Sequence, residues 1–447
     1  MKNRRAAGRG SRMRRRTSTF LGRVALGVLA ALAGVGPVGC AGDETPDQVT
    51  LRVANWGSPA VESSFMALER QFLREFEQLH PGVRVQVEQI PGFGQYAPKL
   101  LMMHVSGSVP DVISLDASSG AAFMDNGVLR DLKPYIERDA SFRLDDYFGN
   151  LVKIFRRGDK LYSIPLDFTP MMMYYNRKLF DAAGLPYPRP GWTWEDFRRT
   201  AGALTIRDPN PVRPPRQYGF NFINVMPFWV LWLWTNGADV LSPDGRKAGG
   251  HFDGPGSVEA VQFLTDLMLK DHVAPTLEES KAAGVDLFRS GQAAMDLKGH
   301  WMMIDYRADG IDFGVVDLPT NTGSPTTVVY LTGLSITSRA RHPDLAWEYV
   351  KFMTGREVQI RRVASGLAIS GNRHAAAHYA GNPVEDAFIA AVEYARPPWG
   401  ATVERYPFIE GLGEEMLEDL LYSKGSLGVA AQLRRTAALI DAALSEP

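Results

Sequence analysis

The chain has 447 residues, enough for two or three domains of ~150 residues with a sizeable core. Its composition, 45% hydrophobic and 22% charged, is that of an ordinary globular protein, which excludes a disordered chain and a polytopic membrane protein. Nine of the 49 Lys and Arg residues precede Cys40. From Cys40 onward the chain therefore has 40 basic residues against 50 Asp and Glu residues. This excess of negative charge makes a nucleic-acid partner unexpected.

The first 39 residues have the pattern of an export signal. A basic run is followed by an uncharged apolar stretch from Val24 to Val38. This stretch is shorter than the ~20 residues that a membrane-spanning helix needs. The run Arg14–Arg16 also has some likeness to a twin-arginine signal, although its spacing differs. We therefore expect residues 1–39 to be a signal peptide and the mature protein to be exported.

The only cysteine in the sequence, Cys40, follows the apolar stretch directly, so no disulfide can form within the chain. The run from Pro37 to Cys40 resembles the leader of a bacterial lipoprotein, although Pro37 replaces the usual leucine. This resemblance implies that Cys40 is lipidated and that residues 40–48 form a tether to the membrane. The alternative is an ordinary cleaved signal peptide with an incidental cysteine.

The next elements alternate between strand and helix. Val49, Leu51 and Val53 alternate with polar residues and predict a strand that ends near Trp56. Apolar residues at helical spacing follow over 65–79, and a second strand begins at Val83. A strand–helix–strand unit of this kind builds a parallel sheet, so we predict an α/β fold.

Further elements follow in the same manner. Thr193 is predicted to cap a helix with Asp196 three residues later, and the proline-rich stretch 208–216 is predicted to be a surface loop. Helices are also predicted over 96–105, 345–358 and 429–444, and strands over 110–116, 161–167, 171–176 and 312–319.

The order of several short motifs resembles the extracellular solute-binding proteins of ABC importers, in the sugar-binding group that is similar to maltose-binding protein. The motifs are Pro110-Asp111-Val112, Tyr175-Asn176-Arg177-Lys178-Leu179-Phe180, Ala183-Gly184-Leu185-Pro186, Thr193-Trp194-Glu195, Gly291-Gln292-Ala293-Ala294-Met295 with Phe288, Gly299-His300-Trp301 and His342-Pro343-Asp344-Leu345-Ala346-Trp347-Glu348. Each motif is weak alone, but together they span the chain after Cys40.

This resemblance implies a two-lobed periplasmic-binding-protein fold with a ligand cleft between discontinuous lobes. The N-terminal lobe would comprise 49–166 and 326–364, and the C-terminal lobe 167–325 and 365–447. Ligand contacts to both lobes would stabilise a closed form by hinge motion. The expected partners are a carbohydrate ligand, the permease subunits of an ABC transporter and the membrane. The protein itself is expected to be monomeric and to need no cofactor.

Sugars present hydroxyl groups to carboxylates and C–H faces to aromatic rings, so the site should combine Asp and Trp. Strand ends carry ligands in open α/β sheets, which points to Trp56 and Asp116. Asp116 has the position of a ligand-binding acid in the family, and Asp167 that of an acid near the hinge. The structural alternatives are a core tryptophan for Trp56, a helix cap for Asp116 and a turn for Asp167.

The later part of the chain supplies four more candidates. By resemblance, Trp301 and Trp399 are cleft aromatics that would stack on the ligand, and packing is the alternative for both. Trp232 lies in an aromatic run that we expect to be mostly core. Gly333 fits a position where the backbone approaches the ligand closely, or a simple turn.

No metal or cofactor motif is found. The eight histidines lack metal-ligand spacing, and no nucleotide-binding glycine motif occurs. Tyr174 and Tyr175 would point to opposite faces of a strand, which argues against an iron site of paired tyrosines.

The leading hypothesis is a non-catalytic receptor that captures a sugar or oligosaccharide outside the cytoplasmic membrane and delivers it to a permease. One alternative is a secreted glycoside hydrolase that uses Asp116 and Asp167 as its two carboxylates. Another keeps the fold but binds a glycerol-phosphate-type polyol, for which Arg373 and Arg396 would supply positive charge.

Overall fold

A computed structural model describes residues 48–57, 65–91, 93–366, 368–424 and 426–445. The predicted signal peptide, Cys40 and all of the predicted tether except its last residue lie outside this part of the chain. Within the described residues, no helix combines the length and apolar character needed to cross a membrane.

Among the residues that the structure describes, the strands form one sheet and one small hairpin. In the ten-stranded sheet the order is β2-β1-β3-β10-β6-β8-β7, with β9 and β11 paired to β6 and β12 paired to β10. The strands are β1 (Val49–Gly57), β2 (Val83–Pro91), β3 (Val112–Asp116), β4 (Arg156–Arg157), β5 (Lys160–Leu161), β6 (Ile164–Asn176), β7 (Tyr218–Asn221), β8 (Ala293–Gly299), β9 (Phe313–Val316), β10 (Thr327–Ile336), β11 (Ile369–Ser370) and β12 (Ala395–Arg396).

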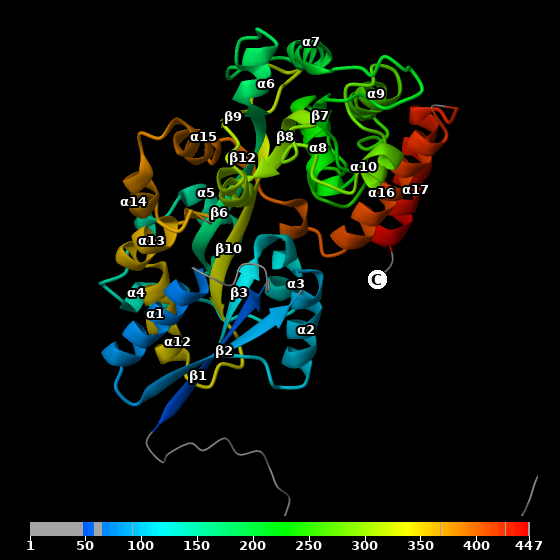
Figure 1. Cartoon of the computed structure of the whole chain (residues 1–447). Coiled ribbons are helices and arrows are strands. Elements are labelled where there is room, and N and C mark those ends of the chain that lie inside the picture. Colours follow the sequence, from blue (N-terminus) through cyan, green and yellow to red (C-terminus); the bar gives the residue numbers. More distant parts are fainter. Residues whose placement is uncertain (1–47, 58–64, 92, 367, 425, 446–447) are drawn as a thin grey trace, which may run out of the picture. The chain divides into compact units, whose positions relative to one another are not determined.

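Helices cover this sheet along most of its length (Figure 1). They are α1 (Phe65–Leu79), α2 (Phe93–Val105), α3 (Gly120–Asp125), α4 (Lys133–Arg138), α5 (Gly149–Ile154), α6 (Arg177–Ala182), α7 (Trp194–Leu204), α8 (Met226–Thr235), α9 (Pro255–Leu269), α10 (Leu277–Ala283), α11 (Met303–Ala308), α12 (Pro343–Thr354), α13 (Arg356–Val363), α14 (Arg373–Ala376), α15 (Pro383–Ala391), α16 (Tyr406–Tyr422) and α17 (Val429–Ser445). The alternation of helices and strands confirms the predicted α/β class.

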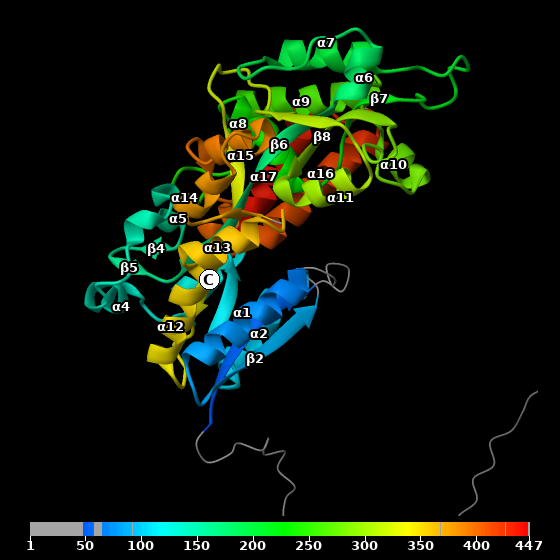
Figure 2. The ribbon, with the colours of Figure 1, turned by 60° about the vertical axis from the view of Figure 1, so that its left-hand side comes forward.

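The N-terminal unit β1-α1-β2-α2-β3 confirms the strand–helix–strand prediction. The three strands are parallel, with β1 in the middle. The helix α1 has the predicted bounds and packs against α12 and α13, which come from much later in the chain (Figure 2). Phe72 and Phe76 of α1 are fully buried, because they lie on the apolar face that the periodicity indicated.

Two long strands, β6 and β10, join the two halves of the sheet. The N-terminal half of β6 pairs with β10, and its C-terminal half pairs with β8 and β9. The other side of β10 pairs with β3. Both strands therefore contribute to the packing around β1–β3 and to the packing around β7–β8.

The buried apolar residues gather in two large clusters. One surrounds β1–β3 and extends to Tyr174, Tyr306 and Phe388, and the other surrounds α8, α9, α16 and α17. The first cluster thus contains residues that the predicted boundaries assign to the C-terminal lobe. The boundaries at 166, 325 and 364 stay predictions, but apolar packing divides the chain differently from them.

Two other local predictions agree with the structure, but the single helix predicted over 345–358 is in fact two helices, α12 and α13, which meet at Gly355. Thr193 caps α7 by accepting a hydrogen bond from the Asp196 N–H, and the Asp196 carboxylate accepts one from the Thr193 N–H, which is the predicted reciprocal pair. The stretch 208–216 contains no helix or strand.

Candidate functional site

A row of polar side chains crosses the three central strands. Thr332 of β10 pairs with Asp116 of β3 on one side and with Asp167 of β6 on the other. Ser370 of β11 pairs with Asp167 and extends the row. The two acids predicted from separate strand ends therefore lie on neighbouring sides of one strand, although their environments differ.

Asp116 ends β3 and caps the following 3-10 turn, residues 117–119. Its Oδ1 accepts a hydrogen bond of 2.8 Å from the backbone N–H of Ser118. The side chain is half-buried, and this burial raises its pKa to about 6, with a smaller contribution from the charge of Asp167. The cap that the sequence offered as an alternative is present, and it is compatible with ligand contact.

Asp167 belongs to a buried ion cluster that links three parts of the chain. Its Oδ2 accepts from Nη2 of Arg362 at 2.9 Å, and Nη1 of the same guanidinium pairs with Glu69 of α1. Burial raises the pKa of Asp167 against the opposing pull of Arg362. The visible role of this acid is to hold α13 and α1 against β6, and a contact of Asp167 with ligand remains a prediction.

Four aromatic and acidic side chains gather near Asp116. The ring of Trp301 meets that of Tyr330 edge to face at 6.0 Å, and Trp399 donates from Nε1 to Glu410 Oε1 at 3.0 Å. Burial raises the pKa of Tyr330, and the charges of Glu410 and Asp116 raise it further, so both acids lie close to this tyrosine. We define the site cluster as Asp116, Trp301, Tyr330, Trp399 and Glu410.

Glycines allow two of these aromatic side chains to lie where they do. A Cβ on Gly299 would lie only 2.0 Å from the ring of Trp301, so the ring folds back over this residue. A Cβ on Gly400 would lie 2.1 Å from the carbonyl oxygen of Ser118. The turn that carries Trp399, residues 399–401, therefore packs directly against the turn that Asp116 caps.

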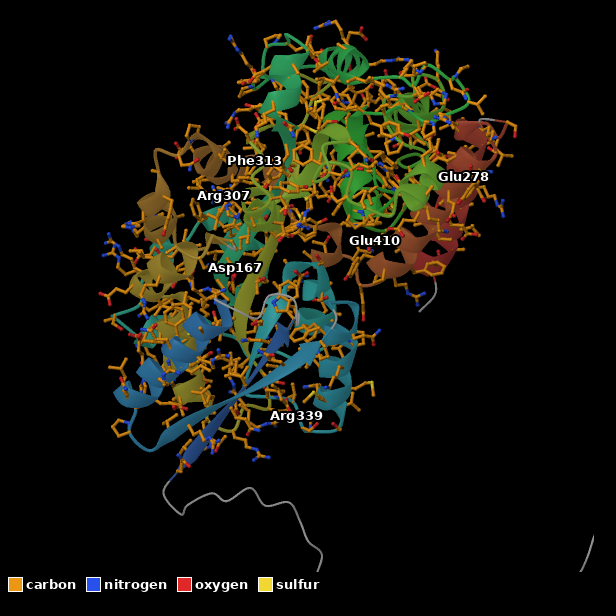
Figure 3. The ribbon with its side chains drawn as sticks, viewed as in Figure 1. Asp167, Glu278, Arg307, Phe313, Arg339 and Glu410 are labelled. Atoms are coloured by element: carbon orange, nitrogen blue, oxygen red, sulfur yellow. The ribbon has the colours of Figure 1, made fainter. Side chains whose placement is uncertain are left out.

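Glu410 is the second acid of the site cluster. It lies on α16, whereas Asp167 lies on β6 (Figure 3). Burial raises its pKa to about 7, helped by the charge of Glu414 and opposed by the hydrogen bond from Trp399. Both acids of the cluster therefore titrate closer to neutrality than ordinary carboxyl groups do.

Trp56 lies near the same end of the sheet. It follows Asn55 on β1, whose Oδ1 accepts a hydrogen bond of 2.7 Å from Ser114 Oγ of β3. Trp56 is 40% exposed, so it is not the core tryptophan that the sequence allowed as an alternative. Its contact with a ligand remains a prediction.

Two predicted site residues lie within protein packing. Trp232 is 1% exposed, and its ring packs against those of Phe197, Phe220 and Phe263. A Cβ on Gly333 would lie 2.3 Å from Ser163 Oγ. Gly333 is in a strand rather than a turn, and the close approach that it permits is to side chains of the protein itself.

Sequence reasoning missed Tyr330 and Glu410. It also missed Tyr406, which lies beside the cluster: burial raises its pKa, and the charges of Glu410 and Asp116 raise it further. Tyr330 is half-buried between the buried residues Val329 and Leu331, a pattern that many strands share. Tyr406 and Glu410 are four residues apart and therefore share one face of α16. That spacing was the available signal, but it does not distinguish a site from any polar helix face.

The other candidates have local explanations. Arg396 pairs with Asp239, and its guanidinium lies 4.1 Å from the centre of the Trp234 ring, whereas Arg373 is exposed on α14. Tyr174 donates to the Gly299 carbonyl within the first apolar cluster, and Tyr175 belongs to the second cluster. Among the described residues, no group of three or more His, Cys, Asp and Glu side chains could hold a metal ion.

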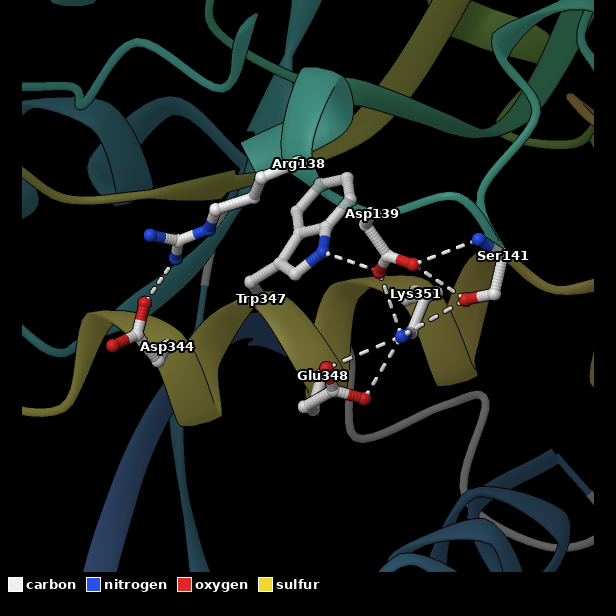
Figure 4. A network of polar contacts seen from close by, with 7 residues as sticks. All are labelled: Arg138, Asp139, Ser141, Asp344, Trp347, Glu348 and Lys351. Carbon is white, nitrogen blue, oxygen red and sulfur yellow. Dashed lines mark hydrogen bonds and ion pairs between the residues drawn. The ribbon is translucent and has the colours of Figure 1, made fainter. Parts of the chain in front are cut away.

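A pocket of about 370 Å³ lies outside the site cluster, between α4 and α12. Its charges are matched within the protein: Arg138 pairs with Asp344, and Lys351 contacts Asp139 at 2.8 Å (Figure 4). Partial burial opposes ionisation of Asp139, but hydrogen bonds from Lys351, Ser141 and Trp347 outweigh it and hold its pKa well below the usual range. This network joins α4 to α12 and needs no ligand to satisfy it.

Comparisons with known proteins agree with this architecture. A sequence profile of the family described as bacterial extracellular solute-binding protein matches residues 60–360. A solved ABC substrate-binding protein of Listeria monocytogenes, in complex with cycloalternan, superposes with a TM-score of 0.77 at 22% identity, covering 90% of this chain and 100% of the other. This likeness confirms the predicted two-lobed fold.

Two curated relatives differ in the ligands that their names give. The multiple sugar-binding protein of Streptococcus mutans is 23% identical over 69% of this chain and 71% of its own length. The sn-glycerol-3-phosphate-binding periplasmic protein of Brucella abortus is also 23% identical, over 55% of this chain and 58% of its own length.

Proposed function

This chain belongs to the bacterial extracellular solute-binding proteins, and from that premise we propose that it captures a sugar or oligosaccharide for an ABC importer. It would hold the ligand outside the cytoplasmic membrane, or in the periplasm, and deliver it to the permease subunits. The family consists of binding proteins rather than enzymes. We propose no catalytic step and no cofactor for this chain.

The observation that carries the proposal is the site cluster. It places two carboxyl groups, Asp116 and Glu410, beside the half-buried rings of Tyr330, Trp301 and Trp399. Carboxyl groups accept hydrogen bonds from sugar hydroxyls, and aromatic faces suit the C–H faces of pyranose rings. Because Asp116 and Glu410 come from distant parts of the chain, a ligand that contacts both would join them.

The hydrolase alternative is weakened by the environment of Asp167. A glycosidase needs one carboxyl group to act as an acid and a second to act as a base or nucleophile across the scissile bond. Asp167 instead makes a 2.9 Å ion pair with Arg362 inside a buried cluster. A group held in this way is not available to a glycosidic oxygen.

The polyol-phosphate alternative has a named relative, but the cluster argues against it. A phosphate group needs cationic partners, whereas the side chains near Tyr330 include Asp116 and Glu410. Arg396 is already paired with Asp239. We therefore rank a neutral sugar above a glycerol phosphate.

A ligand panel tests the proposal. The soluble form that begins after Cys40 is screened by thermal shift against sugars, oligosaccharides and polyol phosphates. A ligand at ~100 times its dissociation constant should add roughly 2.7 kcal/mol to the free energy of unfolding. Stabilisation by a sugar with recovery of that sugar unchanged supports a receptor. Release of new reducing ends supports the hydrolase, and a response to polyol phosphates alone overturns the sugar assignment.

Lobe closure is part of the proposal. With lobes at 49–166 plus 326–364 and 167–325 plus 365–447, a ligand that touches both would favour the closed form by its differential affinity. Solution scattering at saturating sugar should then give a smaller radius of gyration. An unchanged radius together with tight binding contradicts the hinge.

The membrane anchor is proposed from the leader alone. Lipidation at Cys40 would hold the protein on the membrane, since acyl chains contribute ~0.8 kcal/mol per buried methylene. The variant Cys40→Ser should therefore appear in the soluble fraction. A variant with a cleaved leader that still sediments with washed membranes refutes the anchor.

A further inference from the structure

One end of the sheet collects the starts of the parallel strands β1, β2 and β3. In a strand–helix–strand unit the helix runs back along the strands, so it ends where the next strand begins. The C-terminal ends of α1 and α2 therefore lie at the same end as Val49, the first residue of β1. The segment that follows β10, residues 337–342, also reaches this end, because β10 is antiparallel to β3.

Hydrogen bonds confirm that these segments meet. The N–H of Val49 donates to the Gly82 carbonyl at 2.8 Å, in the turn after α1. Arg52 of β1 donates from Nη1 to the Ser108 carbonyl at 2.9 Å, in the turn after α2. The N–H of Arg341 donates to Asp111 Oδ1 at 2.6 Å, just before β3. Four separate segments thus share one end of the sheet.

Exposed apolar and basic side chains occur together at this end. Leu79, Met102 and Val105, in the last turns of α1 and α2, are 65%, 72% and 82% exposed. The basic residues Arg84, Arg339 and Arg341 are also exposed. We call these six residues the strand-start face. Arg339, for example, lies near the lower end of α2 (Figure 3).

Among the described residues, the acids near this face are already engaged, whereas Asp43, Glu44 and Asp47 of the predicted tether lie outside the described residues. Glu88 pairs with Arg52 at 3.3 Å, and Glu77 accepts a hydrogen bond from the Val85 N–H at 2.8 Å. Asp111 is buried and accepts from the backbone N–H groups of Arg52 and Arg341. Within the described residues, no ion pair involves Arg84, Arg339 or Arg341. The face therefore presents positive charge beside apolar side chains.

The length of the chain before β1 indicates what this face meets. Eight residue steps separate Cys40 from Gln48, the first described residue, and a fully extended chain spans at most ~3.6 Å per step. An acyl chain on Cys40 would therefore keep the start of β1 within about 29 Å of the bilayer. The part of the protein nearest to that start is the strand-start face.

We propose that the strand-start face docks on the anionic lipid surface to which the chain is anchored. The inference rests on the lipid anchor proposed above. Exposed aliphatic side chains beside arginines suit the boundary between acyl chains and anionic headgroups. A short tether supplies the high local concentration that lets a weak surface contact persist. Docking through this face would also fix the orientation of the protein on the bilayer.

The test compares two labelled positions in the lipidated protein. Cys40 is the only native cysteine and is acylated in this form, so an introduced cysteine can be labelled specifically. A fluorophore is placed at Val105→Cys on the face, or at Val212→Cys, which is 90% exposed between α7 and β7. Both proteins are reconstituted into phosphatidylglycerol–phosphatidylcholine vesicles that carry a headgroup quencher.

The proposal predicts stronger quenching at position 105 than at position 212. The double variant Arg339→Glu/Arg341→Glu, with an unchanged melting temperature, should lose most of this difference, and so should vesicles of phosphatidylcholine alone. Equal quenching at the two positions overturns the proposal, as does a difference that charge reversal leaves intact. If the protein does not float with the vesicles, the lipid anchor on which the proposal rests is absent, and the proposal is wrong. Sugar binding, measured by calorimetry on the same samples, reports separately on the proposed function.

Discussion

The tryptophans of α8 and those of the site cluster look alike in the sequence but lie in different surroundings. Trp232 is 1% exposed and is packed by aromatic rings from α7, β7 and α9. Trp301 and Trp399 are half-buried, and their neighbours include Tyr330 and Glu410. The protein itself buries the α8 tryptophans, whereas the tryptophans of the site cluster retain exposed ring surface that a ligand could cover.

The two acids of the central row differ in the same way. Asp167 has a cation, Arg362, at 2.9 Å, whereas the interactions that shape Asp116 are hydrogen bonds from Ser118 and the repulsion of Asp167. One acid is held by a completed network and the other is not. A pattern of residues in a sequence cannot distinguish such groups, because the difference lies in their neighbours.

The largest effect is expected for Trp232→Ala. Removing a fully buried indole leaves a cavity and should lower the free energy of unfolding by ~3 to 5 kcal/mol. Affinity for ligand, measured on the remaining folded protein, should stay unchanged. Trp232→Phe, which retains a ring, is the matched control and should cost less. A loss of affinity without a loss of stability would move Trp232 into the site.

A similar loss is expected for Arg362→Leu. It leaves Asp167 and Glu69 buried without their cation, which typically costs ~3 to 5 kcal/mol at neutral pH. Because burial raises the pKa of both acids, the folded variant binds protons more readily than the unfolded chain. Its stability should therefore recover relative to wild type as the pH falls. Urea titrations at several pH values test this, and a pH-independent loss would contradict the ion cluster.

A smaller effect, on binding rather than stability, is expected for Trp301→Ala. Loss of a stacking ring should weaken ligand affinity at least tenfold, or ~1.4 kcal/mol. Trp301→Phe should retain most of the affinity. Calorimetry with the sugar found in the panel, together with the unliganded melting temperature, measures both quantities. A large drop in melting temperature with unchanged affinity would place Trp301 with the core group.

The smallest effect is expected for Glu410→Gln. The pKa of Glu410 is raised to about 7, so the folded state holds this proton more tightly than the unfolded chain does. The free energy of unfolding of the wild type therefore falls as the pH rises from 4.5 towards about 7. The variant lacks this titrating group and does not show that loss. The variant should gain on the order of 1 kcal/mol over wild type at about pH 8 and almost nothing at about pH 4. An equal gain at both pH values would contradict the raised pKa.

The sequence predicted much of the fold. The bounds of α1, the cap of α7 and the alternation of β1, α1 and β2 follow from local patterns of apolar and capping residues. The pairing of β3 with β10 does not, because it depends on contacts between residues far apart in the chain. The extension of the first apolar cluster to Tyr306 and Phe388 has the same cause.

The candidate site was predicted only in part. Asp116, Trp301 and Trp399 were named from strand ends and from resemblance, and the structure places them in one cluster. Glu410 and Tyr330 were missed, because a half-buried acid on a helix and a tyrosine in a strand are common features. Trp232 and Gly333 were named for their residue type. In the structure, side chains of the protein itself pack closely against both.

The long strand β10 also has a consequence for the order in which the chain can fold during synthesis and export. Its residue Thr332 pairs with Asp116, which lies 216 positions earlier in the chain. The strand β10, which lies between β3 and β6 in the sheet, is therefore available for pairing only after roughly three quarters of the chain has crossed the membrane. Until then β3 has an unpaired edge, of the kind that exposes a folding intermediate to aggregation. A chain stalled before residue 327 would lack the strand that completes its N-terminal half, so we expect it to depend on chaperones and to be cleared by proteases.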